Sequence, residues 1–132
     1  MKRIIIALYL VLSMPALATE FKPYPLAQIT EREWKDYYEK VSEAFPNSVQ
    51  DHPQQNLIVY RNDKERLSYA FTKVGHPAHP AWVTRQVVEA NGTIDMVQIG
   101  YFAGKEEPFA VLFQQYQKLN DQMRAKFSAN SK

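Results

Sequence analysis

Two histidines stand three residues apart in the segment GHPAHP, at positions 76 and 79. Imidazole is a common metal ligand, so His76 and His79 are candidate ligands, with His52 or Asp51 as a third donor. Each histidine precedes a proline, which favours an extended or polyproline backbone. Residues three apart are then separated by about 9 Å along the chain, so both rings reach one ion only if the loop folds back. Metal binding through this loop is therefore an alternative prediction and not the main one.

The same loop is suited to contact another molecule. Stiffening by two prolines reduces the entropy that the loop loses on binding, and exposed imidazole and indole rings make good contact groups. An arginine nearby can anchor a carboxylate of the partner. The predicted contact surface consists of His76, His79, Trp82 and Arg85, with Tyr101 behind them. The competing interpretation is structural: the two imidazole rings pack on Trp82 or bond to neighbouring carbonyl groups.

No residue pattern in the sequence marks a catalytic site. Cysteine is absent, and no serine after residue 18 lies in a nucleophile-elbow pattern. The segment Gly100–Gly104 lacks the spacing and the lysine of a phosphate-binding loop. Glu89 and Asp95 flank an expected hairpin tip, where solvent is the expected neighbour. The sequence therefore favours a non-enzymatic protein without a cofactor.

The first 18 residues have the pattern of a secretory signal peptide. Lys2 and Arg3 precede the apolar run Ile4–Leu12, and Ala16-Leu17-Ala18 places small residues at both positions that signal peptidase reads. The apolar run is roughly half of the ~20 residues that span a bilayer. We expect cleavage after residue 18 and a periplasmic or secreted product without a stable membrane anchor.

Charge and cysteine content narrow the class of protein further. The chain has 16 Lys and Arg against 14 Asp and Glu, and loss of Lys2 and Arg3 with the leader leaves 14 of each sign. Nucleic-acid binding requires a positive stripe, and the sequence shows no basic cluster. A chain of about 114 residues without disulfides must be held by its core. These features favour a protein of the bacterial cell envelope that does not bind nucleic acid.

Asn91-Gly92 predicts a tight turn between two strands, because both residue types tolerate the positive φ angles of a type I′ hairpin. A two-residue loop places Trp82 opposite Tyr101 and Thr84 opposite Ile99. Apolar side chains then occupy both faces of the hairpin. Either the register is shifted by one residue, or the second face is covered as well.

Two helices flank the predicted strands. The capping box Thr30–Glu33 starts the first helix and Pro46-Asn47 ends it, and the last helix starts near Pro108. Their apolar stripes are Trp34, Tyr37, Tyr38, Val41, Ala44 and Phe45 in the first, and Phe109, Leu112, Phe113, Tyr116, Leu119, Met123 and Phe127 in the last. Before the hairpin we expect two strands, Leu57–Tyr60 and Leu67–Lys73, joined by a charged turn. Residues 47–56 are expected to form a surface loop.

These elements predict a single α+β domain over residues 19–132, with a four-stranded antiparallel meander between the N-terminal helix and a C-terminal helix packed on the sheet. Residues 19–29 form an extended arm and residues 128–132 a frayed tail. The element order is similar to that of cystatin-like folds, an analogy of topology that implies no activity.

The sequence thus predicts an exported, soluble, non-enzymatic binding protein of the bacterial cell envelope. Its partner would be a protein or peptide-like ligand, as for inhibitors, immunity proteins or accessory factors. One alternative is a small-ligand pocket or hydrolase-like site between helix and curved sheet, lined by Tyr37, Tyr38, Phe71 and Ile99. Metal binding through the histidine loop is a second, and homodimerisation through an edge strand is a third.

Overall fold

The computed structural model describes the backbone of residues 20–130 and the side chains of residues 20–127. The predicted leader, residues 1–18, lies outside the described residues. The described part contains two helices, α2 (Glu31–Ala44) and α3 (Glu106–Asn130), and one antiparallel sheet in the order β1-β2-β3-β4-β5. The strands are β1 (Val49–His52), β2 (Leu57–Asn62), β3 (Leu67–Thr72), β4 (Ala81–Ala90) and β5 (Thr93–Phe102). The predicted α+β architecture is confirmed, and α3 continues into residues 128–130, which were expected to fray.

The sheet has five strands, so the prediction of a surface loop over residues 47–56 is wrong. Val49–His52 pairs with Leu57–Tyr60 as an edge strand, and Asn56 supports the connecting turn with a φ of 54°. Three of the four β1 residues are exposed. An edge strand without a buried face carries no apolar alternation, and the periodicity therefore gave no sign of it.

The β4–β5 hairpin has the predicted register. Trp82 pairs with Tyr101 and Thr84 with Ile99, and the turn residues Asn91 and Gly92 have φ angles of 54° and 77°. Positive φ at both positions is the geometry of a type I′ turn.

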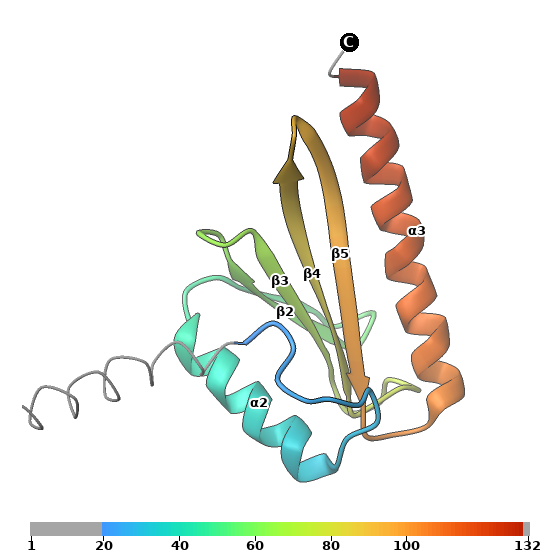
Figure 1. Cartoon of the computed structure of the whole chain (residues 1–132). Coiled ribbons are helices and arrows are strands. Elements are labelled where there is room, and N and C mark those ends of the chain that lie inside the picture. Colours follow the sequence, from blue (N-terminus) through green and yellow to red (C-terminus); the bar gives the residue numbers. More distant parts are fainter. Residues whose placement is uncertain (1–19, 131–132) are drawn as a thin grey trace, which may run out of the picture.

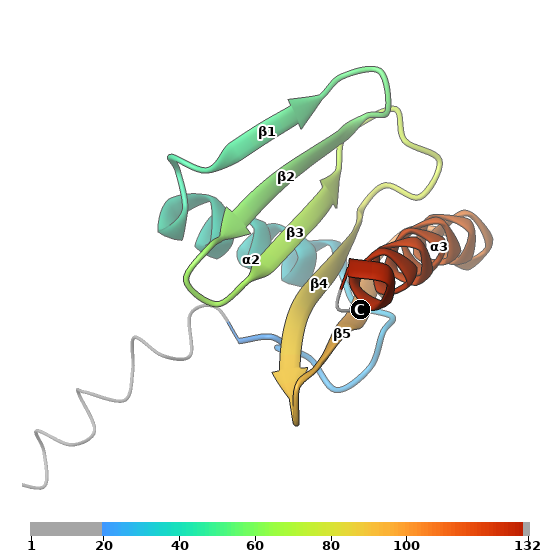
Figure 2. The ribbon, with the colours of Figure 1, turned by 90° about the horizontal axis from the view of Figure 1, so that it is seen from above.

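The two helices cover opposite faces of the sheet (Figures 1 and 2). α2 packs on the face that carries Tyr69, Phe71 and Trp82, whereas α3 packs on the face that carries Val83 and Phe102. Figure 2 shows that α3 lies over β4 and β5, and Leu57 at the start of β2 is buried in the same apolar cluster as Leu112 of α3. Both faces of the hairpin are apolar because each one meets a helix, which is the second of the two explanations offered above.

The α2 side of the core is aromatic. The predicted capping box is present, with the Thr30 hydroxyl accepting from the Glu33 amide at 3.1 Å and the Glu33 carboxylate accepting from the Thr30 amide at 2.9 Å. This cap starts α2 so that Tyr37 and Val41 point into the core. Tyr37 then stacks on Trp82 with ring centroids 4.5 Å apart.

The α3 side depends on a close approach at Gly100. A Cβ atom at this position would lie 2.6 Å from Cζ of Phe109 and 2.9 Å from Cδ1 of Phe113. Gly100 therefore lets α3 approach the backbone of β5 closely. Farther along α3 the predicted stripe is wrong at one position: Leu119 is 44 % exposed, and Asn120 is turned to the sheet at 3 % exposure.

The N-terminal arm runs beside the end of β5. The amide of Ile29 donates to the carbonyl of Phe102, and the amide of Phe102 donates to the carbonyl of Ala27, both at 2.9 Å. Farther along this edge, Arg124 of α3 donates to the carbonyl of Met96. β1 pairs with β2 alone and leaves its outer edge free within residues 20–130. In that same range, neither helix combines the length and the hydrophobicity needed to cross a bilayer.

Candidate functional site

The five residues of the predicted contact surface do not lie together. Trp82 and Tyr101 are 0 % and 1 % exposed, so the prediction that they form part of a contact surface is wrong. They face α2 and the arm, and the Tyr101 hydroxyl donates to the carbonyl of Tyr24 at 2.8 Å. Arg85 lies on the opposite face of β4, because successive side chains of a strand alternate between the two faces. It contacts α3 through Asn120.

The two loop histidines point into different grooves. His79 lines a groove beside α2, whereas His76 lines a groove beside α3 together with Tyr116 and Leu119. Nδ1 of His76 accepts a hydrogen bond from the amide of Ala78 at 3.0 Å, a bond within the loop itself.

This arrangement does not favour the metal alternative. The third predicted donor, His52, lies in β1, and its neighbour Asp51 pairs with Lys73 at 2.7 Å. Over the described range, no three His, Cys, Asp or Glu residues are grouped so that they could hold an ion.

The groove beside α2 has a volume of about 710 Å³, against about 560 Å³ for the groove that His76 lines. We call the former the α2 groove. Its aromatic wall is formed by Trp34, Tyr38 and His79, and Pro80 closes one side. Charged side chains of both signs from the exposed face of α2 form its rim: Glu31, Arg32, Lys35, Asp36 and Glu39.

His79 is held by Thr72. The Thr72 hydroxyl lies 2.8 Å from Nδ1 of His79 and 3.1 Å from the carbonyl oxygen of Ala81, and it accepts from the Ala81 amide at 2.9 Å. The single hydroxyl proton of Thr72 goes either to the Ala81 carbonyl or to Nδ1 of His79, and in both cases Nδ1 is bonded to Thr72.

Trp34 fixes the wall of the groove. Its indole Nε1 donates to the carbonyl of Ala81 at 3.0 Å, and its ring stacks on Tyr38 with centroids 5.4 Å apart and planes 8° apart. The imidazole of His79 meets Trp34 edge-on at 5.1 Å. Tyr38 is fixed in turn by a hydroxyl contact of 3.2 Å with Tyr60.

The histidine loop is held in place by backbone contacts with the segment that follows β5. The amide of Ala103 donates to the carbonyl of Pro80 at 2.8 Å, and a Cβ at Gly104 would lie 2.6 Å from the carbonyl oxygen of His79. The loop and the segment between β5 and α3 therefore touch backbone to backbone, which fixes the position of Pro80 at the side of the α2 groove.

Burial favours the neutral form of the His79 imidazole. It lowers the pKa below the ordinary value of 6.5, and a hydrogen bond to the backbone of Thr72 and the nearby carboxylate of Glu31 oppose this shift. Burial likewise lowers the pKa of His76. A neutral imidazole can act as a base, but no serine and no cysteine lines the α2 groove. The groove therefore offers contact groups and no nucleophile of these two types.

The interior space proposed for a small ligand is filled. Tyr37 and Phe71 are 2 % and 0 % exposed, and Phe71 packs against five aromatic rings, those of Trp34, Tyr37, Tyr38, Tyr60 and Trp82. Tyr38 lines the α2 groove instead, and Ile99 lines a separate, smaller one. A filled core favours binding at the surface over binding in the interior.

Sequence reasoning missed Trp34 as a groove residue and named Tyr38 only for the alternative interior pocket. Both fit the apolar stripe of α2, which was expected to face the core. Because they lie four residues apart, they are neighbours on the helix surface, and both remain only partly buried. A Trp-Tyr pair at the flank of the stripe was the available signal.

Comparisons with family models, with curated proteins and with solved structures found no match for this chain.

Proposed function

We propose that the chain is an exported, non-enzymatic binding protein of the bacterial cell envelope that recognises a protein or peptide-like partner through the α2 groove. The observation that supports this proposal is the groove itself: an open site of about 710 Å³ with an ordered aromatic wall and a charged rim. The leader pattern of residues 1–18 supports export.

Rigidity makes the aromatic wall a suitable anchor site. Trp34 and His79 each hold a hydrogen bond to the framework, through the carbonyl of Ala81 and the hydroxyl of Thr72. Side chains that are already ordered lose little entropy when a partner binds. Aromatic residues also carry a large share of the binding energy in protein interfaces.

The rim adds selectivity. Arg32 and Lys35 lie on the same exposed face of α2 as Asp36 and Glu39. Complementary charges on a partner would fix its orientation and speed association, whereas a mismatch would disfavour binding. We expect an extended segment that places an apolar or aromatic residue against Trp34 and Tyr38 and polar residues along α2.

Capture from an envelope extract tests this function. The mature chain, residues 19–132, would be immobilised in three forms: wild type, Arg32→Glu/Lys35→Glu, and Lys64→Glu/Lys118→Glu as a control. All four positions are exposed, and the last two lie outside the α2 groove. Both double variants change the net charge equally. We expect the rim variant to recover roughly tenfold less of the captured partner, a loss of ~1.4 kcal/mol.

The control variant should recover as much partner as the wild type. Equal recovery of the partner by all three forms would show that the partner binds at a surface other than the α2 groove. Failure of the wild type to capture any protein reproducibly would contradict the binding function itself. If the captured protein is a second copy of this chain, the free edge of β1 is the other surface to test.

A further inference from the structure

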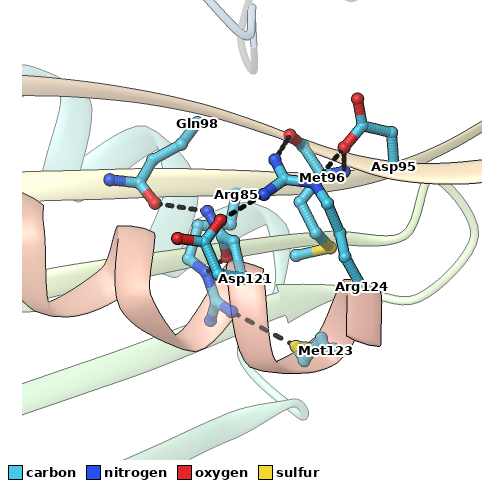
Figure 3. A network of polar contacts seen from close by, with 8 residues as sticks. Arg85, Asp95, Met96, Gln98, Asp121, Met123 and Arg124 are labelled. Atoms are coloured by element: carbon cyan, nitrogen blue, oxygen red, sulfur yellow. Dashed lines mark hydrogen bonds and ion pairs between the residues drawn. The ribbon is translucent and has the colours of Figure 1, made fainter. Parts of the chain in front are cut away.

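Arg85 is a half-buried cation held by neutral groups. Its Nε donates to Oδ1 of Asn120 at 2.9 Å, its Nη2 donates to Sδ of Met123 at 3.5 Å, and its guanidinium lies 5.0 Å from the ring centre of Tyr116. Figure 3 shows Arg85 and Met123 between the sheet and α3. Among residues 20–127, no carboxylate lies within 4 Å of the guanidinium, and Nη1 makes no hydrogen bond.

The nearby carboxylates are already used. Asp95 and Asp121 both pair with Arg124, one turn farther along α3 (Figure 3). One arginine of this interface thus holds two carboxylates, and the other holds none. A partly desolvated cation without a counter-ion is unfavourable. An external anion that pairs with Arg85 would therefore offset the desolvation free energy of its guanidinium, which no carboxylate of the described residues offsets.

Arg85 belongs to a row of polar side chains on the open face of the sheet. The strand register places Arg61 opposite Ser68 and Ser68 opposite Arg85. Strands are spaced about 4.8 Å apart, so the two arginine backbones stand about 10 Å apart with the serine between them. Long side chains at this spacing can converge above the Ser68 hydroxyl, which makes no hydrogen bond to another described residue.

A pocket of about 280 Å³ lies at this row. Its polar side is formed by Arg61, Ser68 and Arg85, and its apolar side by Val87, Met96 and Met123. We call it the arginine pocket. Methionine side chains adapt to irregular apolar groups.

Two further charged residues line the pocket, and neither neutralises Arg85. Asp63 pairs with Arg61 at 3.7 Å, and Arg66 pairs with Glu89 at 3.6 Å. All four of these side chains are about half exposed or more. Exposed pairs of this kind contribute little free energy, so a ligand can rearrange them.

We propose that the arginine pocket binds a carboxylate carried by an apolar group. The carboxylate lies over Ser68 between Arg61 and Arg85, and the apolar group contacts Met96 and Met123. Arginine matches the planar carboxylate with two parallel hydrogen bonds. Free phosphate fits less well because it would leave the apolar side of the pocket without a contact. This site is on the other face of the sheet from the α2 groove, and the inference does not depend on the proposed function.

Two sources carry this chemistry: a free organic acid, and the C-terminal carboxylate of a peptide with apolar last residues. Isothermal titration of the purified protein with octanoate tests the first, with octanol and inorganic phosphate as controls. Titration with acetyl-Gly-Gly-Leu-Leu as the free acid and as the C-terminal amide tests the second. We expect the acid form of at least one probe to bind and its uncharged form to bind at least roughly tenfold more weakly.

Three variants locate the binding. Arg85→Gln removes the unpaired charge and should lower the affinity for the acid roughly tenfold. Arg61→Gln, at an exposed position, should lower this affinity several-fold without disturbing the α3 interface. Lys118→Gln, at an exposed position of α3 that lines neither the α2 groove nor the arginine pocket, is the matched control and should leave the affinity unchanged.

The outcomes separate cleanly. Octanoate binding that depends on Arg85 and Arg61 assigns a free organic acid, and binding of the peptide acid alone assigns a chain terminus. Absence of binding by both acids, equal binding of octanol and octanoate, tighter binding of phosphate, or affinities unchanged in both arginine variants would each overturn the proposal. If Arg85→Gln lowers the melting temperature strongly, the Arg61→Gln result decides.

Discussion

Trp82 lies between Tyr37 and Tyr101, with ring centroids 4.5 Å and 4.9 Å away. Its side chain is fully buried. Replacing Trp82 with Ala should therefore lower the free energy of unfolding by about 3–5 kcal/mol, as for other large-to-small changes in a core. Urea denaturation of the variant measures this loss. His76→Ala, at the partly exposed loop, serves as a reference and should cost far less, and a loss below about 1 kcal/mol in Trp82→Ala would contradict the packing.

His79 gives the protein a dependence on pH. Burial lowers its pKa below 6.5. As the pH falls through this value, the unfolded chain takes up the proton and the folded chain resists it, so stability decreases. We expect the melting temperature to fall between about pH 7.5 and pH 5.5, and to fall less steeply in His79→Asn, whose side-chain amide can still bond to Thr72. Since the pKa of His76 is also lowered, part of the slope should remain. Identical slopes in both proteins would contradict a buried neutral His79.

The sequence predicted the loop and its two histidines but misjudged Trp82 and Tyr101. Both were expected at a contact surface because the hairpin is apolar on its two faces. Alternation along β4 separates Trp82 from Arg85, and the residue types alone do not say which face each helix covers. The one signal that was underused is the hairpin register, which already placed Trp82 and Tyr101 directly opposite each other.

Gly100 controls the position of α3 on the sheet. In Gly100→Ala the added methyl group would meet the rings of Phe109 and Phe113. Phe109 is buried and stacks on Phe102 at 4.9 Å, so it has little room to move. We expect a loss of about 1–3 kcal/mol from overpacking, measured by chemical denaturation.

Gly92→Ala is the control for Gly100→Ala. At Gly92 a Cβ would meet nothing within 4 Å, but φ is +77°. This variant therefore suffers backbone strain and no steric clash, at a cost of about 1 kcal/mol. The NMR chemical shifts of the Phe109 and Phe113 rings should change in Gly100→Ala alone. A Gly100→Ala protein as stable as the wild type would contradict the close approach.

At the level of elements, local rules predicted most of the fold. The capping box at Thr30 and the turn at Asn91-Gly92 act through backbone geometry within a few residues, which the sequence states directly. β1 was missed because its stability comes from pairing with β2 and not from its own side chains. The prediction that Leu119 belongs to the buried stripe was wrong because Asn120 faces the sheet instead. Asn120 forms hydrogen bonds with Gln98 at 2.6 Å and with Arg85 at 2.9 Å. Such a bridge is a tertiary contact that helical periodicity does not contain.

The whole molecule is a sheet with a helix on each face, and this layering separates two open sites. The α2 groove lies between α2 and the His79-Pro80 segment, and the arginine pocket lies beside α3 on the uncovered part of the other face. A partner at the first site and an acidic ligand at the second can bind without touching. The layering also explains why the five residues of the predicted contact surface do not lie together: the two helices cover opposite faces of the strand that carries Trp82 and Arg85.

The central claim is that the α2 groove, and no other part of the surface, meets the partner. Site-specific photocrosslinking in intact cells tests it most directly. A photoreactive amino acid would replace Lys35 at the groove rim in one protein and Lys64 in the β2–β3 turn in another; both positions are exposed. We predict a crosslinked adduct of one defined size from position 35 and none from position 64. Any adduct from position 64, or no adduct from position 35, would contradict the account.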